Sequence, residues 1–240
     1  MPDTDPFDEI ACILDDLVRT EPAVKYGRIY ETFYAANVSP EHLDELLANG
    51  WRHFAESFYR YDRTLFDGSI REVMPLRIKL SDFVPSKSQR RILKRNCDLE
   101  IALNPAEIDE ESVALFRAHR ERFKSNAPNS LYDYLSVFGP AERPSPVGEM
   151  RVHREKKLVA VSYFDIGRNA LSGVYAMFDP SEACRSLGTF TMLKEIEHAI
   201  ETGRKFYYQG YAYQGESFYD YKKRFRGTQV FDWREGWEPI

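Results

Sequence analysis

The sequence contains little cysteine and no long apolar run. Its 3 cysteines lie far apart and form no CxxC pair, so we expect neither a disulfide framework nor a four-cysteine metal site. No segment approaches the ~18 consecutive apolar residues of a membrane-spanning helix, and the acidic N-terminus lacks the basic region of a secretory signal. These absences predict a protein of the reducing cytoplasm with no membrane partner.

A net positive charge is also lacking, since 33 Lys and Arg stand against 38 Asp and Glu and give the 240 residues a formal net charge of −5. Taken as an average, this value argues against a nucleic-acid partner. The charge is unevenly distributed, however: residues 1–16 contain acids but no base, whereas residues 85–95 and 222–226 contain bases but no acid. Because a local field matters more to an anionic ligand than the total charge, these two basic segments are compatible with an RNA partner.

The apolar periodicity predicts a mixed α/β protein with a substantial core. Helices are expected at residues 7–19, 40–49, 86–95, 110–124 and 190–202. Strands are expected at residues 52–61, 74–80, 158–164, 171–178 and 205–213. The strands at 158–164 and 171–178 are nearly continuous apolar runs, which predicts that both of their faces are covered. The proline-rich segment 139–147 predicts a loop.

The order of elements across residues 158–213 points to a fold class. Two strands, a glycine-containing turn, a helix and a further strand form the central part of an acyltransferase fold of the GCN5-related N-acetyltransferase type. In that fold a helix N-terminus faces the acyl donor, because its free N–H groups bind negative or carbonyl oxygens. We therefore expect a smaller N-terminal α/β region at residues 1–98 and an acyltransferase-like domain at residues 99–240.

The turn before this helix offers a weak signal for coenzyme A. Acetyltransferases hold the CoA pyrophosphate with a loop of the form R/Q-x-x-G-x-G/A. Here Arg185 and Gly188 fit, but Phe190 stands where a very small residue is expected. A glycine turn that leads into a core helix explains the segment equally simply, so CoA-dependent N-acyl transfer remains an alternative.

Several motifs resemble the arginyl-tRNA–protein transferases and the related bacterial leucyl-tRNA–protein transferases. The similar segments extend over roughly residues 40–230, and the most specific are PSKSQRR, VYxxFDP and the SLGT that follows closely. The remaining segments are GWRHFAESFYRY (50–61), YYQGYAY (207–213) and YDYKKRF (219–225). The resemblance implies that an amino acid moves from the 3′ end of a charged tRNA to an amine, classically the N-terminus of a protein that begins with an acidic residue.

A tRNA partner agrees with the basic and aromatic segments. Lysines and arginines would neutralise phosphates, and aromatic rings would stack on the unpaired bases of the CCA end. Core packing is the alternative role for these aromatics, and a solvated helix face is the alternative for PSKSQRR. The residues expected to bind tRNA are Lys87, Arg90, Arg91, Lys94, Tyr221, Lys222 and Arg226.

The reaction needs orientation, a base for the ammonium proton and stabilisation of the oxyanion. Asp179 is the leading acidic candidate and Tyr175 lies on the same strand, although an Asp-Pro turn would also explain Asp179. The residues expected to bind the reacting groups are Gln209, Tyr211, Gly188 and Thr189. The scattered histidines predict no metal site, and a nucleophilic role for Cys184 is not expected.

The sequence departs from the family where the family carries cysteines. Those cysteines are associated with iron–sulfur or other metal binding, and the corresponding stretches here contain none, so we expect a shortened member without a cluster and without a cofactor. Arginine is the favoured amino acid, but Gln209 and Ala212 replace apolar and aromatic residues of the family, which leaves the transferred amino acid and the acceptor open. A peptide or small-molecule amine in biosynthesis, or a non-catalytic RNA-binding role, remain alternatives.

Overall fold

The computed structural model describes residues 28–66, 68–123, 129–136 and 143–240. The helix expected at residues 7–19 lies outside these residues. Nine strands of the described chain form one mixed sheet, whose main path runs β12-β11-β5-β10-β9-β8-β7-β6. Its strands are β4 (Arg63–Phe66), β5 (Ser69–Lys79), β6 (Glu100–Pro105), β7 (Val147–Arg154), β8 (Lys157–Ile166), β9 (Ala170–Phe178), β10 (Phe206–Tyr213), β11 (Thr228–Asp232) and β12 (Gly236–Pro239).

A second, three-stranded sheet has the order β1-β3-β2. It is formed by β1 (Tyr30–Tyr34), β2 (Arg52–Phe54) and β3 (Ser57–Tyr61). The single strand expected at 52–61 is therefore two strands that reverse at Ala55, which takes a positive φ of 46°. No glycine or proline marks this turn, so the sequence gives no signal for it.

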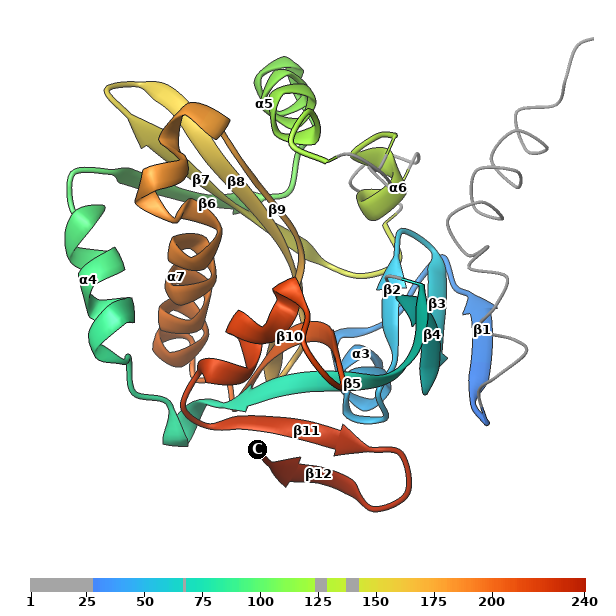
Figure 1. Ribbon diagram of the computed structural model, residues 1–240. Coiled ribbons are helices and arrows are strands. Elements are labelled where there is room, and N and C mark those ends of the chain that lie inside the picture. Colours follow the sequence, from blue (N-terminus) through green and yellow to red (C-terminus); the bar gives the residue numbers. More distant parts are fainter. Residues whose placement is uncertain (1–27, 67, 124–128, 137–142) are drawn as a thin grey trace, which may run out of the picture.

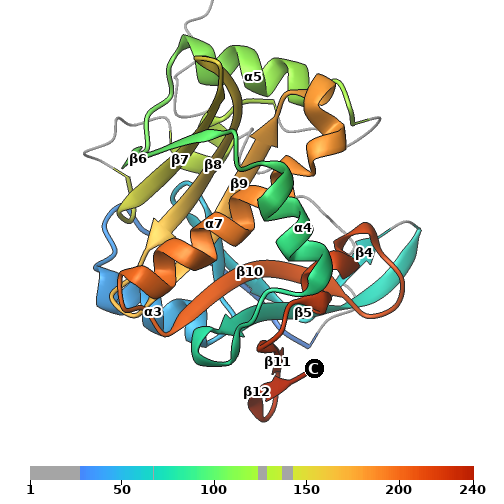
Figure 2. The same ribbon diagram turned by 90° about the vertical axis from the view of Figure 1, so that its left-hand side faces the viewer.

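Helices cover both faces of the main sheet. They are α3 (Pro40–Ala48), α4 (Lys87–Arg95), α5 (Glu110–Arg120), α6 (Tyr132–Leu135) and α7 (Leu187–Glu201), with 3₁₀ turns η1 (Leu80–Asp82), η3 (Pro180–Arg185) and η4 (Phe218–Arg224). Figure 2 shows α4 and α7 side by side on one face, with α5 on the far side of β8 and β9. In this described part of the chain, no helix has the length and apolar character to cross a membrane.

The helix starts follow their capping residues. Ser39 caps α3 and accepts a hydrogen bond from the backbone N–H of His42. Ser86 caps α4 in a reciprocal capping box with Gln89, which is the arrangement that a serine three residues before glutamine predicts. Both helices confirm the sequence expectation closely.

The expected fold class is confirmed by the mixed sheet and its β8–β9–α7–β10 order. β8 and β9 are antiparallel, α7 crosses over, and β10 returns parallel to β9. Residues 158–165 of β8 are all buried, as the continuous apolar run predicts. The division expected at residue 98 stays a prediction, but the main sheet takes strands from both sides of it, because β5 pairs with β10 and β11.

Candidate active site between β9 and β10

The two parallel strands at the centre of the sheet separate soon after they begin. β9 and β10 pair only from Ala170 with Phe206 to Ser172 with Tyr208. Beyond that point β9 continues along β8, and β10 continues along β5 after a register shift at Gln209. We call the space between the diverging strands the splay cleft, and the point where they separate its apex.

Arg52, from the short strand β2, bridges the apex. Its Nη1 donates to Ser172 Oγ at 2.9 Å, and its Nη2 donates to the carbonyl of Gly173 at 2.6 Å. Both acceptors belong to β9 at the point where pairing with β10 ends. The guanidinium therefore replaces part of the ladder that the diverging strands lose, and it carries a fixed positive charge into the apex.

A buried polar chain holds Arg52 in position from behind. Ser172 Oγ donates to Asp165 Oδ2 at 3.1 Å, and His53 Nε2 lies 3.1 Å from Asp165 Oδ1. His53 and Asp165 are 6% and 1% exposed. Burial disfavours the imidazolium, but the neighbouring Asp165 carboxylate outweighs it and raises the pKa of His53. The histidine is thus a structural partner of Asp165 that helps to fix Ser172.

Lys222, from η4, turns inward toward the same apex. Its Nζ donates to the carbonyl of Tyr211 at 3.2 Å. A Cβ placed on Gly210 would lie 3.3 Å from Lys222 Nζ and 3.5 Å from Arg52 Nη2, so both cations adjoin this one glycine. Burial, with a further contribution from Arg52, lowers the pKa of Lys222 to about 7.

A carboxyl group lies against the opposite side of the apex. Glu195 of α7 is 2% exposed and accepts a 2.5 Å hydrogen bond from Tyr207. A Cβ on Gly173 would lie 2.9 Å from the Tyr207 hydroxyl oxygen and 3.6 Å from Glu195 Oε2. Burial raises the pKa of Glu195 to about 7, so this carboxyl is protonated in half of the molecules near neutral pH.

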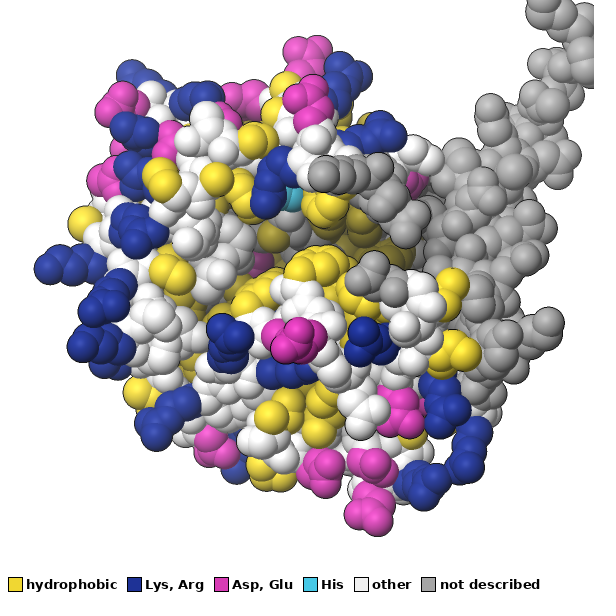
Figure 3. All heavy atoms as spheres, in the orientation of Figure 1, with side chains coloured by type: hydrophobic (Ala, Val, Ile, Leu, Met, Phe, Trp, Pro, Cys, Tyr) yellow, Lys and Arg dark blue, Asp and Glu magenta, His cyan; other side chains and the backbone are white. Residues whose placement is uncertain are grey.

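Aromatic side chains wall the splay cleft. Tyr175 of β9 stacks on Tyr134 of α6 with ring centroids 4.3 Å apart, and Tyr134 meets Phe54 edge-on at 4.9 Å. Tyr211 of β10 packs edge-on against Tyr59. Figure 3 shows the resulting hollow between α6 and η4, with hydrophobic side chains along its walls.

Three of the predicted site residues belong to this cleft. The Tyr175 hydroxyl is buried without a hydrogen-bond partner among the described residues, and burial raises its pKa to about 12. Gln209 donates from Nε2 to the Lys222 carbonyl at 2.9 Å, while its Oε1 is buried without a partner in that same set. The Tyr211 hydroxyl donates to the Gly50 carbonyl at 2.8 Å.

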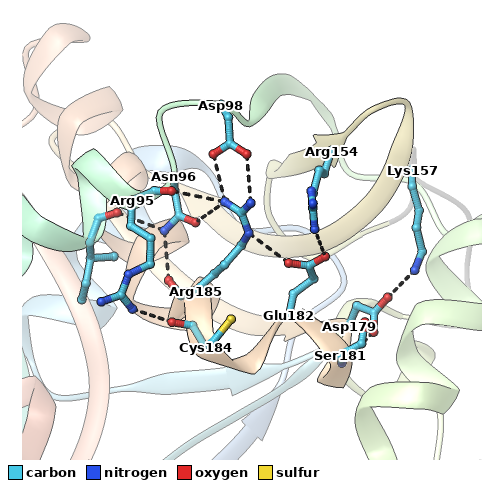
Figure 4. Close-up of polar contacts among 11 residues, drawn as sticks. Arg95, Asn96, Asp98, Arg154, Lys157, Asp179, Ser181, Glu182, Cys184 and Arg185 are labelled. Carbon is cyan, nitrogen blue, oxygen red and sulfur yellow. Dashed lines mark hydrogen bonds and ion pairs between the residues drawn. The ribbon is translucent and has the colours of Figure 1, made fainter.

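Asp179, the predicted acid, lies elsewhere. It stands six residues after Gly173 along an extended strand, which is about 20 Å at ~3.3 Å per residue. Its carboxylate accepts from Lys157 Nζ at 2.6 Å and from Ser181 N at 2.9 Å, as Figure 4 shows. The hydrogen bond from Lys157, followed by those from Ser181, lowers the pKa of Asp179 to about 2. The Asp-Pro turn is therefore present, and a catalytic role for Asp179 stays a prediction.

Arg185, the first residue of the possible CoA loop, is held by protein groups. It pairs bidentately with Asp98, with two N–O distances of 2.9 Å, and donates from Nε to Glu182 at 2.9 Å. We call these contacts the Arg185 clamp (Figure 4). Phe190, expected to obstruct the loop, instead points into the core and is 3% exposed. Its bulk therefore does not oppose CoA, and the guanidinium of Arg185 is engaged by carboxylates of the protein.

The predicted residues Gly188 and Thr189 lie in the first turn of α7, which begins after Ser186 in a left-handed conformation. Thr189 donates to the Ser186 carbonyl at 3.1 Å. The N–H groups of Leu187 and Gly188 come before the first N–H of α7 that has an acceptor within the helix, so the helix itself gives them no partner. The helix start therefore has N–H groups without an intrahelical acceptor, and the binding role of Gly188 and Thr189 stays a prediction.

The two basic segments differ in structure. Lys87, Arg90, Arg91 and Lys94 are exposed on α4, and Figure 3 shows Lys and Arg side chains gathered over this helix. In the second segment Tyr221 and Arg226 are exposed, whereas Lys222 turns toward the cleft. Lys222 was expected to contact tRNA phosphate, and its inward position makes it a residue of the apex instead.

Comparison with known proteins identifies the family. A family model for the C terminus of arginine-tRNA-protein transferase matches residues 111–232, and one for its N terminus matches residues 23–91. The chain belongs to the arginine-tRNA-protein transferase family. It is 35% identical over 171 residues to an aspartate/glutamate leucyltransferase of Xanthomonas campestris, with 68% of each chain covered. Members of this transferase family use an aminoacyl-tRNA as donor.

Solved structures are similar at lower levels. A C-terminal domain of a putative lysylphosphatidylglycerol synthetase from Agrobacterium fabrum is 14% identical, with a TM-score of 0.47 over 87% of this chain and 61% of that chain. FemX is 11% identical, with a TM-score of 0.48 over 94% of this chain and 75% of that chain.

The candidate site contains residues that sequence reasoning missed. Arg52, Asp165 and Glu195 come from three distant elements and meet only through the tertiary fold. Arg52 lies within a segment quoted for the family resemblance, so the motif marked its neighbourhood but not its role. A glutamate in the apolar stripe of α7 was a visible anomaly, because an unpaired buried carboxyl is costly.

Proposed function

We propose that this transferase moves leucine from a charged tRNA to the α-amino group of a protein or peptide that begins with aspartate or glutamate. The observation that carries the proposal is the splay cleft, with aromatic walls and two cations at its apex. An aromatic wall suits the CCA end and an apolar aminoacyl side chain. The relatives named aspartate/glutamate leucyltransferase support the same donor and acceptor.

The charge of the apex favours leucine over arginine, the amino acid that the sequence favoured. Arg52 and Lys222 would repel a cationic arginyl side chain held beside them. The nearby carboxyls are engaged, since Asp165 contacts His53 and Ser172 while Glu195 accepts from Tyr207. An arginyl group would therefore find no unengaged carboxylate of the protein here, whereas a leucyl group needs none.

The exposed bases of α4 suit the body of the tRNA. α4 is joined to the start of α7 because Asn96 donates from Nδ2 to the Arg185 carbonyl at 2.9 Å. Phosphates held on α4 would thus be fixed relative to the helix start and the cleft. Each neutralised phosphate releases counterions, so binding should weaken steeply with salt.

The chemical step needs no enzyme nucleophile. The neutral α-amino nitrogen of the acceptor attacks the ester carbonyl carbon, a C–N bond forms, and the C–O bond to the terminal ribose breaks. The proton lost by the amine balances the one gained by the ribose hydroxyl. Positioning of donor and acceptor supplies much of the rate enhancement in such a reaction.

A panel of labelled aminoacyl-tRNAs with peptides that differ only in their first residue tests the proposal. Leucine transfer to peptides beginning with Asp or Glu is the expected result. Transfer of arginine alone would overturn the choice of leucine. Absence of transfer from every charged tRNA would overturn the proposal as a whole. The double variant Arg91→Ala with Lys94→Ala should bind tRNA less well than the wild type.

A further inference from the structure

The apex of the splay cleft contains two basic side chains, Arg52 and Lys222, that no carboxylate contacts directly. Other bases nearby are paired: Arg60 with Glu31 at 2.8 Å and Lys223 with Asp220 at 2.8 Å. Within residues 28–66, 68–123, 129–136 and 143–240, Arg52 and Lys222 belong to no ion pair. Asp165 reaches Arg52 only through the Ser172 hydroxyl.

We infer that Arg52 and Lys222 form a carboxylate-binding site that receives the acidic side chain of the acceptor's first residue. This inference rests on the proposed function, since it assigns the residues that select the acceptor. The Arg52 guanidinium disfavours a second positive charge on Lys222, and an anion bound between the two groups would stabilise the protonated lysine. The lowered pKa of Lys222, which burial and Arg52 cause, agrees with a site that lacks its counter-charge.

The local geometry leaves donors available for such a ligand. Arg52 uses Nη1 and Nη2 to hold Ser172 and Gly173, but each nitrogen carries a second N–H group. Lys222 spends one of its three N–H groups on the Tyr211 carbonyl. Gly210, with φ of +86°, places no side chain between the two cations. A carboxylate can therefore accept from both cations without displacing their structural partners.

The surroundings favour a carboxylate on a short stem over a tRNA phosphate. Tyr59 and Tyr211 lie close enough to Arg52 for its charge to act on both, and burial raises the pKa of each. The exposed bases lie on α4 instead. In an aspartyl or glutamyl N-terminus the carboxylate is only a few bonds from the α-amine, so binding at the apex would place the nucleophile inside the splay cleft.

The test compares acceptor peptides beginning with Asp, Glu, Asn, Gln or Ala at saturating Leu-tRNA. In the wild type we expect an Asp over Asn preference in kcat/KM of at least about 10-fold, because a lost charge-assisted hydrogen bond typically costs 10- to 100-fold. Lys222→Met should reduce this preference about 10-fold, mainly through KM. Lys223→Met is the matched control, since its ammonium pairs with Asp220 and the Tyr213 carbonyl, and it should keep the preference.

A second variant and a second measurement keep the outcomes separate. Arg52→Lys retains the charge but cannot hold Ser172 and Gly173 together, and it should also weaken the Asp preference. An unchanged preference for Asp over Asn in both variants would overturn the inference. A loss of tRNA affinity that accompanies the loss of preference would also overturn it, because the two residues would then bind phosphate. If the wild type transfers nothing, calorimetric binding of Asp-first against Asn-first peptides still tests the site independently of the proposed function.

Discussion

Replacing Glu195 by glutamine should stabilise the protein at alkaline pH. Glu195 is 2% exposed, and its nearest polar partner is the Tyr207 hydroxyl at 2.5 Å. Burial raises its pKa from 4.5 to about 7. The folded state therefore retains a proton that the unfolded chain has released between these two pH values, and stability falls as pH rises through this window.

The size of the effect follows from the pKa values. At ~1.4 kcal/mol for each pH unit between the two pKa values, the ionised carboxyl lowers the free energy of unfolding by about 3 kcal/mol above pH 7. Glutamine has nearly the same shape, carries no charge and can still accept from Tyr207. Its amide can donate to Ser162 Oγ, which lies beside Glu195 and has no other partner among the described residues.

Urea denaturation between pH 4.5 and pH 8.5 measures this difference directly. Glu195→Gln and wild type should have similar free energies of unfolding at the acidic end, and the variant should exceed wild type by about 2–3 kcal/mol at the alkaline end. Glu201→Gln, on the exposed end of the same helix, controls for a glutamine on α7. A difference that stays constant over the pH range, or that favours the wild type at pH 8.5, would refute the reasoning.

Three other predictions concern separate parts of the molecule. Arg91 and Lys94 are both exposed on α4. Replacing both by alanine should reduce tRNA affinity and make the slope of log affinity against log salt concentration less steep by about 2. An unchanged slope would argue against contact between these residues and tRNA phosphates. Asp179→Asn keeps an oxygen that can cap η3 but loses the ion pair with the exposed Lys157, so it should cost at most about 1 kcal/mol at pH 7. Because the folded pKa of Asp179 is about 2, this cost should vanish as pH falls from about 4 toward 2. A loss of kcat beyond about threefold would support a catalytic role for Asp179. Tyr175→Phe removes a buried hydroxyl without a described partner and should leave stability within about 1 kcal/mol, so that a lower kcat would assign the hydroxyl to the reaction.

The sequence predicts the central elements because their signals are local. Ser39 and Ser86 mark helix starts by side-chain capping, and the apolar runs of β8 and β9 mark strands. The expectation that both faces are covered is confirmed for β8 but wrong for β9, where residues 173–175 are half-buried and Ala176 is exposed. The sequence does not predict β7, because charged residues interrupt the apolar pattern that would mark a buried strand. Glu149 and Arg151 are 2% and 8% exposed and form an ion pair at 2.6 Å, and a single sequence does not show that the two charges satisfy each other.

The site is less predictable than the fold because its groups meet through tertiary contacts. Tyr175, Gln209 and Tyr211 were identified from the strands that flank the helix, and these strands do form the splay cleft. Lys222 has the same sequence character as its neighbour Lys223. Only the fold shows that one ammonium lies beside Arg52 while the other pairs with Asp220.

The Arg185 clamp bears on how a member of this fold class can use a donor other than CoA. Arg185 donates to both Asp98 oxygens, to Glu182 and to the Arg95 carbonyl, so its planar fork is largely saturated. A pyrophosphate could therefore bind the Arg185 side chain only by displacing a bidentate carboxylate. The same contacts fasten the end of α4 to the start of α7, because Arg95 also donates to the Cys184 carbonyl. An arginine that matches the first position of the acetyltransferase loop therefore serves here to fix α4, with the exposed bases proposed to bind tRNA, against the start of α7.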